Sequence, residues 1–381
     1  MNTDELTILD LPGGDPRRRG HVHGETLRSQ IVALLDRWGD GLESTYGVSR
    51  ERYVERFHAT THYVATTELL APDLIAEVRG IAEGAGVPVD DLLAFQHVNE
   101  EFELGPAFAA EACSTIILPP STSRPALIAQ NLDLAQYLDG YQILLRCPTA
   151  DGTGEIMALS VPGMLSLNGM NSHGFAVCDN TVNQLRPNPE GLPIYALYRL
   201  LLESKTLAEA CALVERTPPA TGINWVMGDP DGVVMIERSG HAMVTSPGGS
   251  TPVYHTNHPV TCTDLAARAR AADARPQPSR SSYLRLASLH QRLHNADAAM
   301  LGVDDLKAVL SARDDPDYPV SRGGSNGDDR AIGFTLACSV FELARDRPRW
   351  HLASGPGHCT AMRVFELSPS AADRSPGERS R

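Results

Sequence analysis

Four short segments carry the residue types that could do chemistry. They read "ACST" at 112–115, "QNLD" at 130–133, "GMNSHGFAVCDNTV" at 169–182 and "YHTNHP" at 254–259. A thiolate is a strong nucleophile, while carboxylates and amides can orient its base or stabilise an oxyanion. Each segment alone is a weak signal, because a single cysteine is usually a small buried hydrophobe and loop Asn and Asp usually shape turns. Together and in this order they are far more specific than any one of them.

A new N-terminus at Cys113 would supply the base that such a thiol needs. A free thiol has a pKa of about 8.5, whereas an α-amino group has a pKa of roughly 7.7–8.0, which suits general-base work at neutral pH. Cleavage of the chain before Cys113 would place that amine on the nucleophile itself. The Cys113 thiol could make the cut by attacking the Ala112 carbonyl, giving an N-to-S acyl shift and a thioester that water hydrolyses.

Other catalytic chemistries have weaker signals in this chain. The paired histidines of "HVH" at 21–23 and "HTNH" at 255–258 could bind a metal, but no HExxH motif or nearby carboxylate cluster accompanies them. No G-x-S-x-G motif follows an expected strand, as a serine hydrolase of that type would need. The chain contains no G-x-G-x-x-G or G-x-x-x-x-G-K-[ST] motif, so we expect no cofactor. A metal-dependent hydrolase, and an inactive relative that only binds a small molecule without cleaving itself, remain as alternatives.

The composition of the chain limits which partners it can bind and which cellular compartment it favours. The 381 residues carry a formal charge of −14, which argues against a nucleic-acid binder. We expect the basic run "DPRRRG" at 15–20 to be a solvated turn before a helix. No apolar stretch approaches the roughly 20 residues that span a bilayer, and the N-terminus lacks the features of a secretory signal. Seven cysteines without a CxxC pair favour reduced thiols and a cytoplasmic protein.

The spacing of apolar residues, which predicts the helices and strands that position these residues, changes at Cys113. Before it, apolar spacing predicts helices; after it, short alternating runs separated by Gly, Asn, Asp and Pro predict strands, which together indicate an α+β protein. The expected early helices cover 24–42, 71–86 and 87–104, and the later ones 193–204, 206–216, 280–293 and 304–313. The expected strand runs cover 114–118, 126–134, 141–147, 154–161, 164–182 and 223–240, with turns at 229–232 and 344–349. We expect 264–279 to be a surface excursion and 367–381 a disordered tail.

The chain resembles the acyl-CoA:6-aminopenicillanic acid (isopenicillin N) acyltransferase family nearly end to end. That family belongs to the N-terminal-nucleophile cysteine hydrolases and is related to the choloylglycine hydrolases. Besides the four segments above, of which the last contains "HTNHP" (255–259), the resemblance rests on five further stretches. They are "GHVHGETLRSQI" (20–31), "EVRGIAEGAGVPVDDLLAFQHVNEEFELG" (77–105), "SSYLRL" (281–286), "PDYPVSR" (316–322) and "TLACSVFE" (335–342).

The resemblance implies a four-layer αββα sandwich made as one precursor. Cleavage between Ala112 and Cys113 would give an α chain (1–112) and a β chain (113–381) that stay together as a heterodimer. Position 112 is alanine here, whereas glycine, which crowds the carbonyl less, is commoner in the family.

The resemblance also implies roles for individual residues. Asp133 would hold the new amine, and the oxyanion would be bound by the side-chain amide of Asn257 and the backbone N–H of Asn180. Arg322 would lie near the site, although it is shifted relative to the family's pattern. Arg285 matches a family arginine of structural use.

Four more residues would shape the site: Gln130, Asn131, Ser114 and Thr115. Gln130 stands where choloylglycine hydrolases carry an arginine, which tilts the expectation away from bile salts. The implied activity is amide hydrolysis or acyl transfer on a small N-acyl amine, an amino-acid conjugate or an acyl thioester, with acyl-CoA as one candidate. The sequence does not decide between hydrolysis and transfer, or identify the acyl group and the amine.

Overall fold

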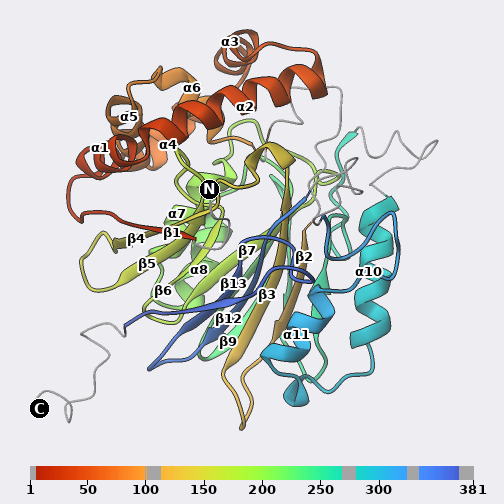
Figure 1. The fold of residues 1–381 in the computed structure, drawn as a ribbon. Coiled ribbons are helices and arrows are strands. Elements are labelled where there is room, and N and C mark those ends of the chain that lie inside the picture. Colours follow the sequence, from red (N-terminus) through yellow and green to blue (C-terminus); the bar gives the residue numbers. More distant parts are fainter. Residues whose placement is uncertain (1–5, 99, 101–112, 268–279, 324–333, 369–381) are drawn as a thin grey trace, which may run out of the picture.

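A computed structural model describes residues 6–98, 100, 113–267, 280–323 and 334–368 (Figure 1). The first hundred residues form helices that pack together at one end of the molecule, after one short strand, β1 (Thr7–Asp10). These helices are α1 (Pro16–Thr26), α2 (Arg28–Tyr46), α3 (Arg50–Thr60), α4 (Tyr63–Leu70), α5 (Pro72–Ala85) and α6 (Val89–Phe95).

Two sheets form the middle of the molecule. The eight-stranded sheet has the order β1-β4-β5-β6-β7-β8-β9-β10, and the six-stranded sheet has the order β11-β2-β3-β12-β13-β14. The eight-stranded sheet adds β4 (Ile143–Pro148), β5 (Glu155–Ser160), β6 (Asn168–Asn171), β7 (Ala176–Thr181), β8 (Ile223–Asp229), β9 (Gly232–Arg238) and β10 (Met243–Pro247) to β1. The six-stranded sheet consists of β2 (Ser114–Leu118), β3 (Ala126–Leu134), β11 (Val253–His255), β12 (Phe334–Leu343), β13 (Arg349–Ala353) and β14 (Arg363–Glu366).

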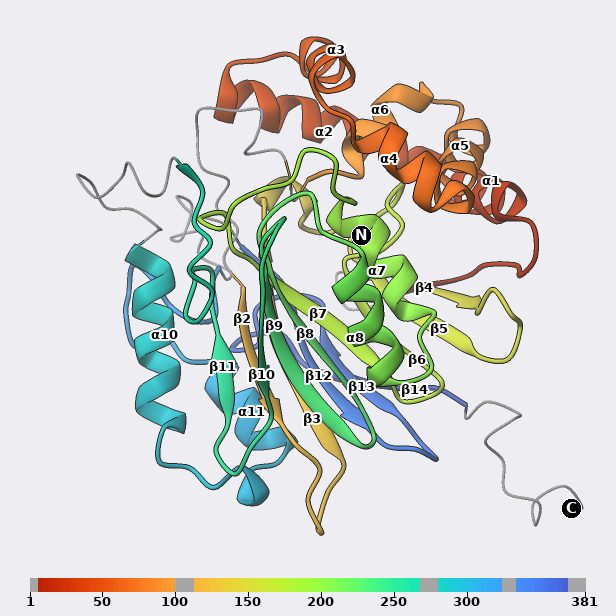
Figure 2. The ribbon, with the colours of Figure 1, turned by 180° about the vertical axis from the view of Figure 1, so that it is seen from behind.

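The two sheets stack face to face, with helices on both outer sides (Figures 1 and 2). Helices α7 (Ile194–Leu202) and α8 (Leu207–Arg216) pack on β6, β7 and β8 of the larger sheet. Helices α10 (Arg280–Leu293) and α11 (Val303–Leu310) pack on β11, β3 and β12 of the smaller one. This layering confirms the predicted four-layer αββα sandwich.

Glycines bring α1 and α5 into backbone contact. A Cβ at Gly20 would lie 1.9 Å from the Glu77 carbonyl oxygen, and one at Gly80 would lie 2.1 Å from that of Arg17. Gly24 and Gly84 repeat this close approach one turn later, opposite Ile81 and His21 respectively. The Gly-x-x-x-Gly spacing in both segments therefore allows the two helices to pack closer than any side chain would permit.

Most of the predicted elements are confirmed, several with the expected bounds. Strands β2 and β3 cover the residues that alternation indicated, and both predicted turns join neighbouring strands. The prediction for "DPRRRG" was wrong, because Asp15 caps α1 and the arginines lie inside that helix, with Arg19 buried against Glu77. Leu367, the first residue of the predicted disordered tail, is buried, and its N–H donates to the carbonyl of Pro348. Residues 369–381 of that prediction lie outside the described residues. Most of the 264–279 excursion lies outside the described residues.

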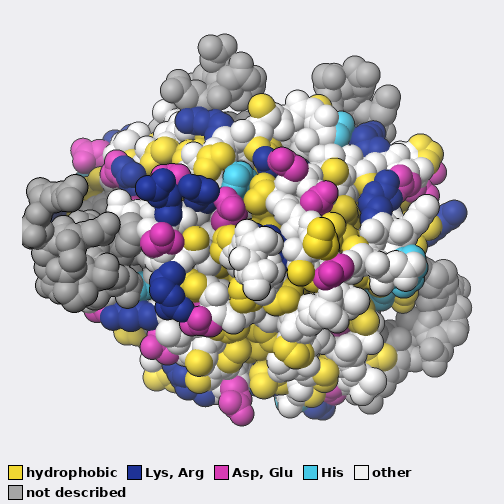
Figure 3. All heavy atoms as spheres, turned by 90° about the horizontal axis from the view of Figure 1, so that it is seen from below, with side chains coloured by type: hydrophobic (Ala, Val, Ile, Leu, Met, Phe, Trp, Pro, Cys, Tyr) yellow, Lys and Arg dark blue, Asp and Glu magenta, His cyan; other side chains and the backbone are white. Residues whose placement is uncertain are grey.

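Within the part of the chain that the structure describes, no helix combines the length and apolarity needed to cross a membrane. Figure 3 shows the end of the sandwich opposite the helices α1–α6. On this face acidic and basic side chains lie close to one another, with hydrophobic side chains between them.

Candidate active site

Cys113 directly precedes β2 and is buried, with 2% of its surface exposed. Side chains along a strand alternate between its two faces. Ile116 and Leu118 pack toward α10 and α11, whereas Cys113 and Ile117 belong to the core between the sheets. The thiol therefore faces the space between the two sheets. Ala112 lies outside the described residues.

Arg285 ties the start of β2 to the loop that carries Asn257. It projects from α10 and is fully buried. Its NH1 donates to the Cys113 carbonyl oxygen at 2.5 Å and to Ser114 Oγ at 2.9 Å, and its NH2 donates to Asn257 Oδ1 at 2.9 Å. Burial lowers the pKa of Arg285 to about 9, and neighbouring Arg322 acts in the same direction. One guanidinium thus holds the predicted nucleophile and a predicted oxyanion ligand together.

Asp133 and Arg322 meet on the helix-covered face of the smaller sheet. Arg322 Nε lies 3.4 Å from Asp133 Oδ2, and the Arg322 guanidinium also bonds Ser281 Oγ. Thr335, opposite Asp133 across β3 and β12, donates to Asp133 Oδ1 at 2.6 Å. Burial raises the pKa of Asp133, although Arg322 and Arg285 oppose this shift. Asp133 therefore lies on the face from which Arg285 reaches the backbone of Cys113, not on the face of the thiol.

The Asn257 amide is held at both ends. Its Oδ1 accepts from Arg285, and its Nδ2 donates to the Thr181 carbonyl at 3.1 Å. Its backbone N–H donates to Ser282 Oγ at 2.8 Å, in the first turn of α10. Since β11 pairs with β2 so that His255 lies opposite Thr115, continuing this register by two residues brings Asn257 level with Cys113.

Asn180 was predicted to offer its backbone N–H to the oxyanion, but in the structure its side chain is the group that faces the other sheet. Val182 N–H donates to the Gly222 carbonyl, and hydrogen-bonded pairs alternate along an antiparallel ladder, so the pair Asn180–Asn224 is also of the hydrogen-bonded type. The Asn180 backbone N–H consequently points along the sheet toward β8. Its side chain instead crosses to the other sheet, where Oδ1 accepts from Thr115 Oγ1 at 2.6 Å. Its buried Nδ2 has no partner among the described residues.

The other two predicted site-shaping residues connect β3 to its surroundings. Gln130 faces the larger sheet, donating to the Asp179 carbonyl at 2.8 Å and accepting from Asn168 at 2.6 Å. Asn131 faces the opposite way and donates to the carbonyls of Leu310 and Val320. Asn131 therefore anchors the segment that leads to Arg322.

The paired histidines do not converge on a common point. His21 and His23 lie on α1, not on a strand, and His23 is buried, with Nε2 accepting from the Gly163 N–H at 3.1 Å. His255 bonds Glu237, and His258 bonds Ser282. Among the described residues, no group of three or more His, Cys, Asp or Glu side chains is arranged to hold a metal ion.

Sequence reasoning missed the central position of Arg285 and the contact of Thr335 with Asp133. One local signal was present: Ser281 and Arg285 stand one helical turn apart in "SSYLRL", and Arg285 Nε donates to Ser281 Oγ at 3.1 Å. That spacing puts Ser281 and Arg285 on one face of α10, but it cannot say what the face meets.

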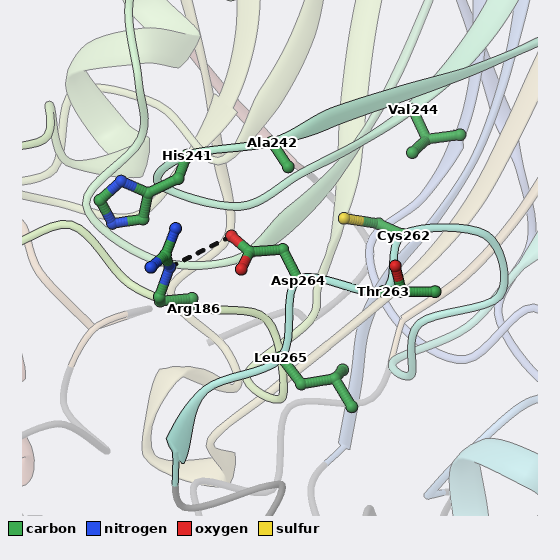
Figure 4. Close-up of a pocket in the computed structure, with 8 residues that line it drawn as sticks. All are labelled: Arg186, His241, Ala242, Val244, Cys262, Thr263, Asp264 and Leu265. Atoms are coloured by element: carbon green, nitrogen blue, oxygen red, sulfur yellow. Dashed lines mark hydrogen bonds and ion pairs between the residues drawn. The ribbon is translucent and has the colours of Figure 1, made fainter.

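A surface depression of about 530 Å³ is lined by residues of the segments that follow Asn180 and Asn257 along the chain (Figure 4). Arg186 follows β7 and Asp264 follows the Asn257 loop; their side chains pair at 3.3 Å, and Arg186 N–H donates to the Asp264 carbonyl. Ser239 Oγ also donates to the Asp264 carboxylate at 2.7 Å. The lining residues are Arg186, His241, Ala242, Val244, Cys262, Thr263, Asp264 and Leu265. The depression is thus built on extensions of the segments that carry Asn180 and Asn257.

Comparison with known proteins finds a matching family and a similar protein. Residues 121–355, more than half of the chain, match the family described as acyl-coenzyme A:6-aminopenicillanic acid acyl-transferase. The 40 kDa form of acyl-coenzyme A:6-aminopenicillanic-acid-acyltransferase from Emericella nidulans is 25% identical over 333 residues, which cover 86% of this chain and 88% of that protein.

Two solved structures show a weaker similarity. A mutant of conjugated bile acid hydrolase from Clostridium perfringens aligns with a TM-score of 0.42 and 12% identity, over 69% of this chain and 93% of that one. Penicillin V acylase from Agrobacterium tumefaciens aligns with a TM-score of 0.39 and 15% identity, over 67% of this chain and 86% of that one.

Proposed function

Because the chain belongs to the acyl-coenzyme A:6-aminopenicillanic acid acyl-transferase family, we propose that it is a self-processing amidohydrolase or acyltransferase with Cys113 as nucleophile. Its substrate is a small N-acyl amine, an amino-acid conjugate or an acyl thioester. The contact that carries this proposal is the hydrogen bonding of Arg285 to both the Cys113 carbonyl and Asn257 Oδ1.

Processing comes first. The Cys113 thiol attacks the Ala112 carbonyl carbon, the Ala112–Cys113 C–N bond breaks, and the proton of the thiol ends on the Cys113 nitrogen. Water then hydrolyses the thioester, which releases the Ala112 carboxylate and leaves Cys113 with a thiol and an α-amine. The products are chains 1–112 and 113–381.

The charges around the site favour the basic form of this amine. Arg285 and Arg322 contribute two positive charges, against the one carboxylate of Asp133. An additional positive charge among these groups is disfavoured, so the neutral amine can accept the thiol proton. Asp133 lies on the backbone side of Cys113, where it can accept a hydrogen bond from the amine.

In turnover, the thiolate attacks the acyl carbonyl of the substrate to give a tetrahedral oxyanion. Asn257 Nδ2, and the side-chain amide of Asn180 in place of its backbone N–H, are the oxyanion ligands. Collapse to the S-acyl enzyme expels the leaving amine or thiol, which takes its proton from the α-ammonium of Cys113. Water or an acceptor amine then resolves the S-acyl enzyme.

Intact mass after expression tests the proposal, with Cys113→Ala as control. The wild type should yield two fragments split at 112/113, and the variant one full-length chain. A wild-type chain that turns over substrate while intact would overturn the mechanism. An intact, inactive wild type would favour the non-cleaving binding protein. A panel of acyl amides, each with and without an amine acceptor, then separates hydrolysis from transfer.

A further inference from the structure

Two rows of polar side chains face each other between the sheets. One row belongs to the larger sheet and the other to the smaller sheet, and each row runs across neighbouring strands. In the larger sheet Asn180 lies opposite Asn224, and Asn224 lies opposite Glu237. Directly opposite residues project from the same face of a sheet. These three buried side chains therefore form one row across β7, β8 and β9.

The second row lies in the smaller sheet and meets the first at two points. Thr115 and His255 are opposite each other across β2 and β11. Thr115 Oγ1 bonds Asn180 Oδ1 at 2.6 Å, and His255 Nε2 lies 2.7 Å from Glu237 Oε1. All four side chains are buried, so these contacts fix the sheets against each other in register.

Glu237 also binds the loop that follows Asn257. Its carboxylate accepts from the backbone N–H groups of Val260 at 2.7 Å, Thr261 at 3.0 Å and Cys262 at 2.6 Å. Burial would raise the pKa of Glu237, but the bond and charge of His255 and the backbone donors outweigh it and lower the pKa to about 2. The carboxylate is therefore ionised throughout the neutral range.

We propose that Glu237 is a positioning residue for acyl transfer, although it lies outside the reacting groups. Cys113 stands two residues before Thr115, and Asn257 stands two residues after His255. By holding His255 and the 260–262 amides, Glu237 sets the place of the Asn257 amide relative to the thiol. This inference rests on the proposed function, in which Cys113 and Asn257 act on the same carbonyl.

The test compares Glu237→Gln with Glu342→Gln. Glu342 forms a matching carboxylate–imidazole contact with His351, at 2.7 Å, toward the end of β12 far from Thr335. The rate of chain cleavage is followed by intact mass, and kcat and KM are measured on a substrate from the acyl panel. Thermal unfolding reports stability. We expect E237Q to slow cleavage and lower kcat by about 10- to 100-fold relative to E342Q at a temperature where both are folded, with KM close to that of E342Q, because a misplaced oxyanion ligand acts on the transition state. The Tm of E237Q should be the lower of the two, since the ionised Glu237 accepts hydrogen bonds from His255 and from three backbone N–H groups.

Equal cleavage rates and kcat in E237Q and E342Q would overturn the inference. If E237Q does not fold, His255→Gln decides in its place, since it removes the same contact from the other sheet; a wild-type rate in that variant overturns the inference. Failure of the wild type to cleave itself would instead contradict the proposed function.

Discussion

The guanidinium of Arg285 lies 2.9 Å from Oδ1 of Asn257, and this contact determines which way the Asn257 amide faces. Arginine can only donate hydrogen bonds, so it selects the oxygen of the amide and leaves Nδ2 on the opposite side, toward Thr181. The same guanidinium holds the carbonyl of Cys113. A side chain from α10 thereby sets both the start of β2, next to the proposed nucleophile, and the amide proposed to bind the oxyanion.

Replacing Arg285 by methionine should slow chain cleavage and lower kcat by about 100-fold, because Asn257 loses its orientation and four buried acceptors lose a donor. Arg285→Lys should recover little, since one ammonium cannot copy the planar guanidinium that reaches the Cys113 carbonyl and Asn257 Oδ1 together. Arg292→Met is the matched control, because Arg292 lies on the same helix but pairs with Asp314 at the surface. Intact mass over time and steady-state rates check this. Equal rates in the two methionine variants would refute it.

Glu77→Gln should weaken the association of the two chains that the proposed cleavage at 112/113 would produce. Glu77 of the 1–112 segment is fully buried and pairs with Arg19 at 2.7 Å and with Arg199 of the 113–381 segment at 3.1 Å. Removing its charge leaves two buried guanidinium groups, which costs about 3–5 kcal/mol.

The measurement is the urea concentration at which the 1–112 fragment separates from its partner in gel filtration. Glu83→Gln on the same helix, where Glu83 pairs with Arg17 at the surface, is the control and should change little. Similar midpoints for both variants would show that the buried charges do not hold the chains together.

Gly80→Ala and Gly39→Ala should have opposite effects on stability. Both glycines lie within helices, where alanine is intrinsically preferred by up to about 1 kcal/mol. At Gly39 the nearest atom to a new Cβ is 3.4 Å away, in ordinary contact, so the variant should be slightly more stable. At Gly80 the new Cβ would overlap the Arg17 carbonyl, forcing α1 and α5 apart. Denaturant unfolding checks both, and a neutral Gly80→Ala would contradict the close packing.

Asp179 should make stability depend on pH. Burial raises its pKa to about 7, although the Tyr198 hydroxyl bonds it. The folded protein thus keeps a proton that the unfolded chain loses near pH 4. The stability from Asp179 is present below that pH and is lost as pH rises through about 7.

Relative to Asp179→Asn, which cannot ionise, the wild type should lose on the order of 2–3 kcal/mol of unfolding free energy between pH 5 and pH 8. Urea unfolding at several pH values measures this difference. Parallel pH profiles for the two proteins would mean that the buried carboxyl does not titrate as described.

The sequence by itself determined the local elements and the family. Alternation located β2 and β3, apolar spacing located α5 within 71–86, and the four polar segments with the further matching stretches indicated the acyltransferase family. These features depend on neighbours along the chain, so they can be recognised without tertiary contacts.

Only the tertiary structure decided which distant groups meet. Arg322 could not be placed from its spacing, yet its Nε lies 3.4 Å from the Asp133 carboxylate, because β12 pairs with β3 and brings Thr335 beside both residues. Likewise, nothing in the sequence linked Glu237 to His255. Their contact follows from strand register and from the stacking of two sheets, and both are set by long-range packing.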